Sequence, residues 1–244
     1  MEPPGSATRS RDGPSLLTLA LAYTLLELAS VAALALLRRD GSPMSVLNPF
    51  GPPEPSRLFF AANPGAIRAG GFLCFASAVP LGTYAATLVS RLHSSGARDA
   101  GSYVAFAGGM AASAGLAAAG VFLWLLSVPE ASASVPVARV LHFLVFLCGG
   151  PAFAVGMGLL AAGASSSVQF ATHVPRWLAW LGLTLGVTGA LSTLGLLSVL
   201  LTVPIPITRL AGFVWLIAVA AKLSRVPSSG PHLVKSYVVV HKDD

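Results

Sequence analysis

Residues 15–37 read SLLTLALAYTLLELASVAALALL and are followed directly by Arg38 and Arg39. A helix that crosses a membrane needs about 20 mainly apolar residues, and this stretch supplies them. It also carries an acid, Glu27, close to its midpoint. A carboxylate at the middle of a bilayer costs about 2.5–3.5 kcal/mol on insertion scales, so it usually faces protein or water rather than lipid. The stretch therefore predicts a transmembrane helix with one polar side chain turned away from lipid.

The composition of the whole chain agrees with a membrane protein. Of its 244 residues 55% are hydrophobic and only 10% are charged, with a mean hydropathy of +0.76. Soluble domains carry about 25% charged residues, so a soluble globular protein is excluded. The net charge of +6 comes from basic residues that stand singly at the ends of apolar runs. This is typical of membrane flanks and not of a nucleic-acid surface, so we expect a lipid bilayer as the surroundings and no nucleic-acid partner.

Five further apolar stretches predict an all-α transmembrane bundle of six helices within residues 15–225. The spans are expected at about 15–37, 69–92, 103–128, 137–163, 177–203 and 209–223. Residues 1–14 are polar and rich in proline, which predicts a disordered tail, and residues 226–244 form a second polar tail. The first span is longer than the apolar part of a signal peptide, so we expect it to be retained. Between the first two spans, the prolines of residues 38–67 predict a loop without regular helix.

Two of the spans contain residues that interrupt helices. Pro80 lies inside the second span, where it frees a backbone carbonyl that Thr83 or a neighbouring helix could satisfy. Gly149, Gly150 and Pro151 follow one another inside the fourth span. A Gly-Gly-Pro run predicts a break or a sharp kink at this point.

Small residues recur along two other spans. In the third span Gly108, Ala112, Gly115 and Ala119 recur at intervals of three or four residues, and the fifth span has Gly182 and Gly186 in GxxxG spacing. Smooth stripes of this kind let helix backbones approach closely. We expect the third span to be central in the bundle, and the close packing to be used within the chain or between copies in a homo-oligomer.

Glu27 and His142 are the main candidates for chemistry inside the membrane. Glu27 lies about 12 residues, or roughly 18 Å, from one face, and His142 lies about five residues, or roughly 8 Å, from the other. In a hydrocarbon core about 30 Å thick these depths nearly coincide, so a Glu27–His142 contact would form a proton-handling pair. The alternative is that Glu27 bonds a neighbouring helix and only holds the bundle together.

Three arginines begin the even-numbered spans and therefore share one face of the membrane: Arg68, Arg139 and Arg209. Three guanidinium groups around one mouth could bind a carboxylate, a phosphate or lipid head groups. The interpretation that we favour is that each one extends to its nearest membrane interface.

Patterns of known catalytic chemistry do not occur in the chain. HExxH, CxxC, GxSxG and GxxxxGK[ST] are all missing from the sequence, and each of them supplies a metal, redox, nucleophile or phosphate site. Only one of the five histidines, His142, lies well inside a span, which argues against haem held by two histidines. We therefore expect no catalytic residues, no metal site and no cofactor.

The orientation follows from the basic residues. Nine of the fifteen Lys and Arg residues fall on the side of the two termini. Because basic residues favour the cytoplasmic side, we expect cytoplasmic termini and a location in the cell (inner) membrane.

Four segments resemble an uncharacterised family of bacterial six-helix membrane proteins. They are RAGGFLCFASAVPLGTYAATLVSRL (68–92), ARVLHFLVFLCGGPAFAVGMGLLAAG (138–163), VPRWLAWLGLTLGV (174–187) and RLAGFVWLIAVAAKLSR (209–225). The resemblance implies the six-helix architecture and carries no activity, cofactor or site residue.

Three functional hypotheses follow. The leading one is a small-solute, proton-linked or lipid-handling membrane protein. We expect its site near Glu27, His142 and the break at 149–151, because broken helices line sites of this kind. The second is a structural or partner-binding subunit without chemistry of its own. The third is a membrane-embedded enzyme using Glu27 and His142 as acid and base, against which the missing nucleophile and metal set count. A cavity reaching Glu27 would favour the first or third hypothesis, and a packed, dry Glu27 the second.

Overall fold

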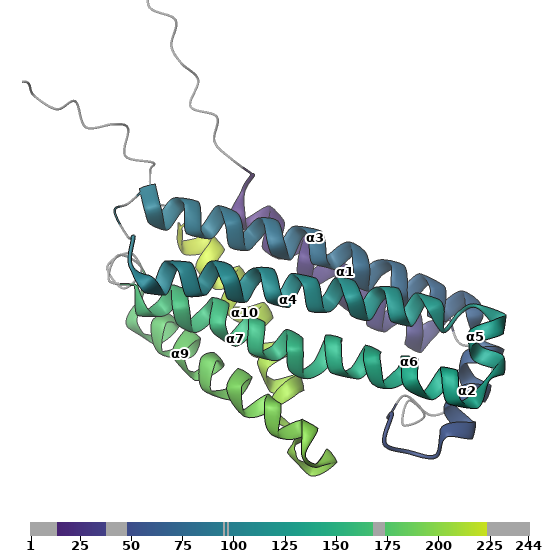
Figure 1. Cartoon of the computed structure of the whole chain (residues 1–244). Coiled ribbons are helices and arrows are strands. Elements are labelled where there is room, and N and C mark those ends of the chain that lie inside the picture. The colour runs from purple at the N-terminus through teal and green to yellow at the C-terminus, as the bar shows by residue number, and fades with distance from the viewer. Residues whose placement is uncertain (1–13, 38–47, 95, 97, 168–173, 224–244) are drawn as a thin grey trace, which may run out of the picture.

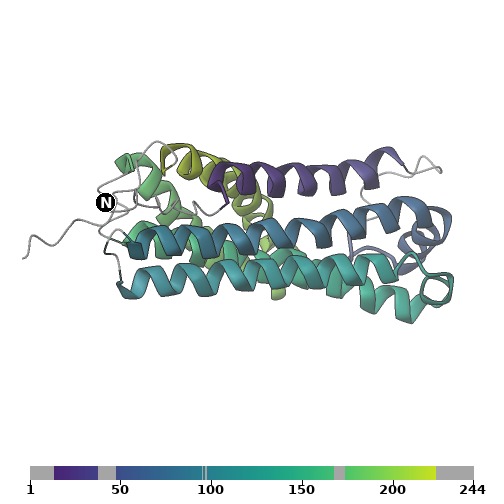
Figure 2. The same cartoon turned by 90° about the horizontal axis from the view of Figure 1, so that it is seen from above.

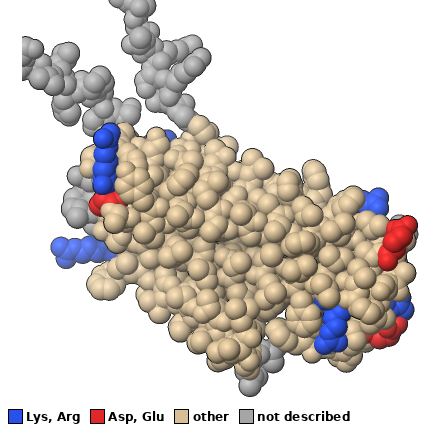
Figure 3. Space-filling view, viewed as in Figure 1, with Lys and Arg blue, Asp and Glu red and all other residues tan. Residues whose placement is uncertain are grey.

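The computed structural model describes residues 14–37, 48–94, 96, 98–167 and 174–223. In these residues the only regular structure is helical, and six helices are long and apolar enough to cross a membrane. The predicted all-α bundle with six candidate spans is therefore confirmed. Charged side chains gather at the two ends of the molecule and leave a broad uncharged surface between them (Figure 3).

The six candidate spans follow one another along the chain. They are α1 (Leu16–Leu36), α3 (Pro64–Ser94), α4 (Ala100–Leu125), α6 (Val135–Leu147) continued through η2 (Cys148–Ala152) into α7 (Phe153–Ser166), α9 (Arg176–Leu191) with η3 (Ser192–Leu196), and α10 (Pro204–Leu223). A short 3₁₀ segment, η4 (Val199–Thr202), precedes α10. The first three spans run alongside one another (Figures 1 and 2).

Two short helices, α2 (Pro53–Ala62) and α5 (Pro129–Ala133), lie together at the end of the bundle opposite to the start of α1 (Figure 1). The prediction that residues 38–67 contain no regular helix is thus wrong for α2. Its prolines occupy the first positions of the helix, where backbone N–H groups have no partner within the helix, so Pro53 and Pro55 remove no hydrogen bond. The buried rings of Phe59 and Phe60 hold α2 against the ends of α3, α4 and α6.

Helix α4 packs between α3 and α7, which confirms the central position expected for the third span. The packing is close because glycines meet the neighbouring backbones. A methyl group on Gly120 would lie 2.5 Å from the amide nitrogen of Phe75 in α3, and one on Gly108 would lie 2.5 Å from that of Leu160 in α7. The GxxxG glycines of α9 also face α7 of the same chain, Gly182 against the Ala161 carbonyl and Gly186 against the Ala162 side chain.

The two predicted interruptions differ in form. Pro80 lies within an unbroken α3. The Thr83 hydroxyl donates to the Val79 carbonyl at 2.9 Å. This is not the carbonyl that lacks a donor because of Pro80, which lies four residues before the proline. The Gly149-Gly150-Pro151 run does not end its helix but forms the π-helical turn η2, so that α6 and α7 make one candidate span.

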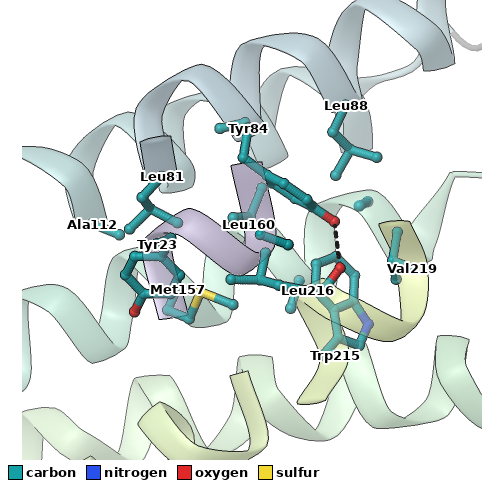
Figure 4. Close-up of a cluster of buried hydrophobic side chains, with 14 of the residues drawn as sticks. Tyr23, Leu81, Tyr84, Leu88, Ala112, Met157, Leu160, Trp215, Leu216 and Val219 are labelled. Atoms are coloured by element: carbon teal, nitrogen blue, oxygen red, sulfur yellow. Dashed lines mark hydrogen bonds between the residues drawn. The ribbon is translucent and has the colours of Figure 1, made fainter. Parts of the chain in front are cut away.

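Buried hydrophobic side chains from all six candidate spans form the main core, part of which is drawn in Figure 4. Tyr84 of α3 donates a hydrogen bond to the Leu216 carbonyl of α10 at 3.1 Å, and Trp215 donates to the Leu178 carbonyl of α9 at 3.1 Å. Each ring therefore fills the core while its polar atom bonds a backbone group of another helix. This core fixes α10 beside α1, α3 and α7, which positions the site described next.

Candidate functional site

The candidate site is built around Glu27 on the inward face of α1. The buried residues of this helix recur at intervals of three or four and form one stripe, which includes Tyr23, Glu27 and Ser30. Because Glu27 belongs to this stripe, its carboxylate points into the bundle, and the residue is only 2% exposed. Of the two surroundings expected for Glu27, protein or water, the structure has the side chain packed in protein.

The partner of Glu27 is Arg209 on α10. Arg209 Nη1 bonds Glu27 Oε1, and Arg209 Nη2 bonds the carbonyl of Gly149 in η2. Ser77 of α3 lies with its hydroxyl 3.0 Å from Glu27 Oε2, and the same hydroxyl is 2.7 Å from the Cys74 carbonyl. The two carboxylate oxygens thus bond different helices, and the guanidinium connects α1 with η2 through α10.

The π-helical turn explains why the Gly149 carbonyl accepts a bond from a side chain. In an α-helix this carbonyl would accept from the amide of Phe153, four residues on. The Phe153 amide instead donates to the carbonyls of Cys148 and Gly150, which leaves the Gly149 carbonyl able to accept from Arg209. The ring of Phe153 also lies 4.8 Å from the Arg209 guanidinium carbon, a cation–π contact that adds to the attraction.

The depth of Arg209 depends on where α10 begins. The sequence placed Arg209 at the first residue of the last span, but α10 begins five residues earlier, at Pro204. Pro204 and Pro206 fit the first turn of the helix, where their missing N–H groups cost nothing. Arg209 is therefore about 14 residues, or roughly 21 Å, from the end of α10, close to the roughly 18 Å calculated for Glu27. The expectation that Arg209 extends to the membrane interface is wrong for this reason.

The predicted Glu27–His142 contact is also wrong. His142 is buried near the middle of α6, where its ring meets the ring of Phe60 of α2 edge to face at 5.1 Å. The carboxylate of Glu27 is occupied by Arg209 and Ser77 instead. The sequence signal that could have identified the true pair is the early start of α10, which brings a guanidinium to the depth of the only acid within the spans.

The three arginines predicted at one membrane face do not form one cluster. Arg68 lies with Nε 3.4 Å from the Ser127 hydroxyl, and Arg139 is exposed with its guanidinium 5.7 Å from the Phe143 ring. Arg209 turns inward to Glu27. Of the residues proposed from the sequence, the structure therefore brings together Glu27, Arg209 and Gly149.

The site offers an acid, a cation and hydroxyl groups, but no metal-binding set. Within the described ranges, no three His, Cys, Asp or Glu side chains are close enough to hold a metal ion. The thiol of Cys74 faces the Leu116 carbonyl at 3.6 Å. What the arrangement can do is hold a proton on Glu27 or an anion on Arg209.

Comparisons with known proteins do not assign the chain to a family. No family model, no curated protein and no solved structure matches this chain.

Proposed function

We propose that the chain is a multi-pass protein of the cell (inner) membrane that handles a small anionic solute in a proton-linked manner. In this proposal Glu27 binds the proton and Arg209 binds the anion. The observation that carries the proposal is the pair itself, in which a partly buried guanidinium meets a buried carboxylate within the bundle. The resemblance to uncharacterised six-helix membrane proteins adds no activity and stays a prediction.

Stability alone is a weak reason for such a pair. Replacing a buried ion pair by apolar residues of similar volume is often neutral or stabilising. Ionisable residues within membrane segments are rare, and they usually mark ion, proton or substrate pathways. The π-helical turn beside the pair supports a functional role as well, because turns of this kind occur frequently at functional sites.

The charges of the pair couple the binding of a proton to the binding of an anion. If Glu27 takes up a proton while the interior is otherwise unchanged, Arg209 is left as an unpaired buried cation, which is strongly unfavourable. A carboxylate or phosphate group that enters and binds Arg209 removes this cost, and the net charge of the interior stays the same. Each ligand therefore raises the affinity for the other, as linkage requires. Arg209 is the more accessible partner, since its side chain is 24% exposed against 3% for Glu27.

The test uses the full chain in liposomes that contain a pH-sensitive dye. Addition of succinate or inorganic phosphate outside should acidify the lumen, because each anion enters with a proton. Glu27→Gln should still take up radiolabelled anion but without acidification, whereas Arg209→Gln should lose both signals. Arg176→Gln is the matched control. It removes an exposed arginine at the start of α9, away from the pair, and should behave like the parent. If folded Glu27→Gln and Arg209→Gln both behave like the parent, the proposal is wrong.

A structural or partner-binding subunit is the second candidate, and the burial of Glu27 favours it, since a packed carboxylate is expected for a subunit without chemistry of its own. The carboxylate has bonding partners on both oxygens, and the surrounding helices meet through glycines without room for a methyl group. Such packing is what a rigid scaffold requires. A parent protein that responds to no anion, but whose thermal stability falls when the pair is broken, would support this function in place of the first.

A further inference from the structure

A pocket lies between α2 and α6, at the end of the bundle opposite to the start of α1, and the candidate site does not use it. It is lined by Pro49, Pro53, Ser56, Arg57, Phe60, Ala138, Arg139 and His142. Its apolar walls include Phe60 and Ala138, which are buried. The guanidinium groups of Arg57 and Arg139 stand beside these walls, and guanidinium groups are the chemistry that recognises a phosphate or carboxylate group.

The charges that face the pocket leave it cationic. Arg57 donates to Glu54 Oε1 through Nε at 3.0 Å and Nη2 at 2.7 Å. These two bonds use two of its five N–H donors, so three donors have no partner among the residues that the structure describes. Arg139 forms no ion pair with any described residue and rests on the Phe143 ring. Glu54 is the acid beside the pocket, and it is already neutralised by Arg57.

The surroundings of the pocket indicate which anion it fits. Exposed apolar side chains adjoin it, among them Phe50, Val137 and Val140, which are 40%, 45% and 60% exposed. The ring of Phe50 lies 5.6 Å from that of Phe143 and 5.2 Å from that of Phe146, so aromatic groups continue from the pocket along α6. A cationic pocket that opens beside an apolar helix face suits a molecule with a charged head and an apolar chain.

We propose that the mouth of this pocket, whose interior has room for about one water molecule, binds the phosphate of an anionic lipid headgroup, with Arg57 and Arg139 as its contacts and the acyl chains along the exposed face of α6. The site is independent of the proposed function, because it contains neither Glu27 nor Arg209 and requires no transport. A free phosphate ion has the same head chemistry but lacks the apolar part that would contact α6.

The test measures binding to the detergent-purified full chain by native mass spectrometry. The probes are a phosphatidylglycerol, a phosphatidylcholine with the same acyl chains, and inorganic phosphate. The parent should bind one phosphatidylglycerol, and Arg57→Gln/Arg139→Gln should bind it at least about tenfold more weakly, because charge-assisted hydrogen bonds are lost. Arg98→Gln/Arg176→Gln removes the same charge from exposed positions at the other end and should bind like the parent.

Three results would overturn the proposal. Equal binding by the pocket variant and the parent would show that the two arginines are not the contacts. An equal loss in the control pair would show that only the overall charge matters. Binding of inorganic phosphate as tightly as phosphatidylglycerol would reject the lipid as the ligand. Should the pocket variant fail to fold, a photoreactive phosphatidylglycerol applied to the parent should label peptides of α2 and α6, and labelling elsewhere alone would contradict the assignment.

Discussion

At the scale of single residues, Glu27 and Arg209 depend on each other for their charge. Glu27→Gln leaves the partly buried guanidinium without a counter-charge, which costs up to about 3–5 kcal/mol, the value for a fully buried pair. We expect Glu27→Gln and Arg209→Gln each to lower the thermal unfolding temperature of the detergent-purified protein markedly. The double variant carries no buried charge and should recover most of the loss. Simple addition of the two single effects would contradict this coupling.

The exposed pair of Glu54 and Arg57 is a second residue-scale case. The Arg57 guanidinium, through its hydrogen bonds, holds the pKa of Glu54 below its usual value, and Glu54 raises that of Arg57. Since the pKa of Glu54 is lowered in the folded protein, the pair persists above the usual carboxyl range and is lost as pH falls through the lowered pKa. Arg57→Gln should raise the pKa of Glu54 toward its usual value. A titration of ¹³C-labelled glutamate carboxylates by NMR checks this, and an unchanged Glu54 pKa would show that the pair does not form in solution.

At the scale of elements, close packing of α4 requires that specific positions have no side chain. Gly108→Ala places a methyl group 2.5 Å from the Leu160 amide nitrogen, so the two helices must separate. Overpacking of this kind typically costs about 1–3 kcal/mol. Gly65→Ala is the matched control, because a methyl group there meets nothing within 4 Å. Thermal unfolding in detergent should show destabilisation by Gly108→Ala and none by Gly65→Ala. Equal unfolding temperatures of the two variants would show that α4 and α7 do not meet at Gly108.

The periodicity of the sequence predicts many features of the helices. It fails where other factors determine the local structure. The stripe of Gly108 and Ala112 was sufficient to predict a central helix, because only small residues permit backbones to touch. The π-helical turn was not predictable in detail, since Gly149, Gly150 and Pro151 are compatible with a kink, a break or a wider turn. The prolines of α2 misled the prediction because proline prevents a helix in its interior but suits its first turn.

At the scale of the whole molecule, the orientation is open to a direct test. Cys74 and Cys148 are first replaced by alanine, and a single cysteine is then introduced at Arg98 or at Glu130, which lie at opposite ends of the bundle. If the termini are cytoplasmic, a membrane-impermeant maleimide should label Glu130→Cys in intact cells and Arg98→Cys only after permeabilisation. We expect this labelling pattern because basic residues are in excess on the side of the termini, and basic residues favour the cytoplasmic side. The reverse labelling pattern would invert the proposed orientation.

The six spans followed from apolar length alone, whereas the site did not. Glu27 could be identified because one acid in an apolar helix must turn inward. Its partner depended on the start of α10 at Pro204, which the prolines of the first turn indicate, and on the packing of α10 beside α1, which no local pattern contains. His142 was a reasonable alternative by depth, but α6 carries it toward α2. Depth places residues along the membrane normal, and only the packing of helices decides which of them meet.

The sequence distance within the buried pair has a consequence for biosynthesis. Glu27 and Arg209 are 182 residues apart, and at typical rates of chain elongation the second follows the first by roughly 10 to 40 seconds. The first helix therefore leaves the ribosome long before its counter-charge exists. Ser77, 50 residues after Glu27, is the earliest of the partners to be made. Until the last helix arrives, the nascent chain must keep this acid protonated, hydrated or sheltered by the insertion machinery, so the order of synthesis makes the final helix the one that completes the fold.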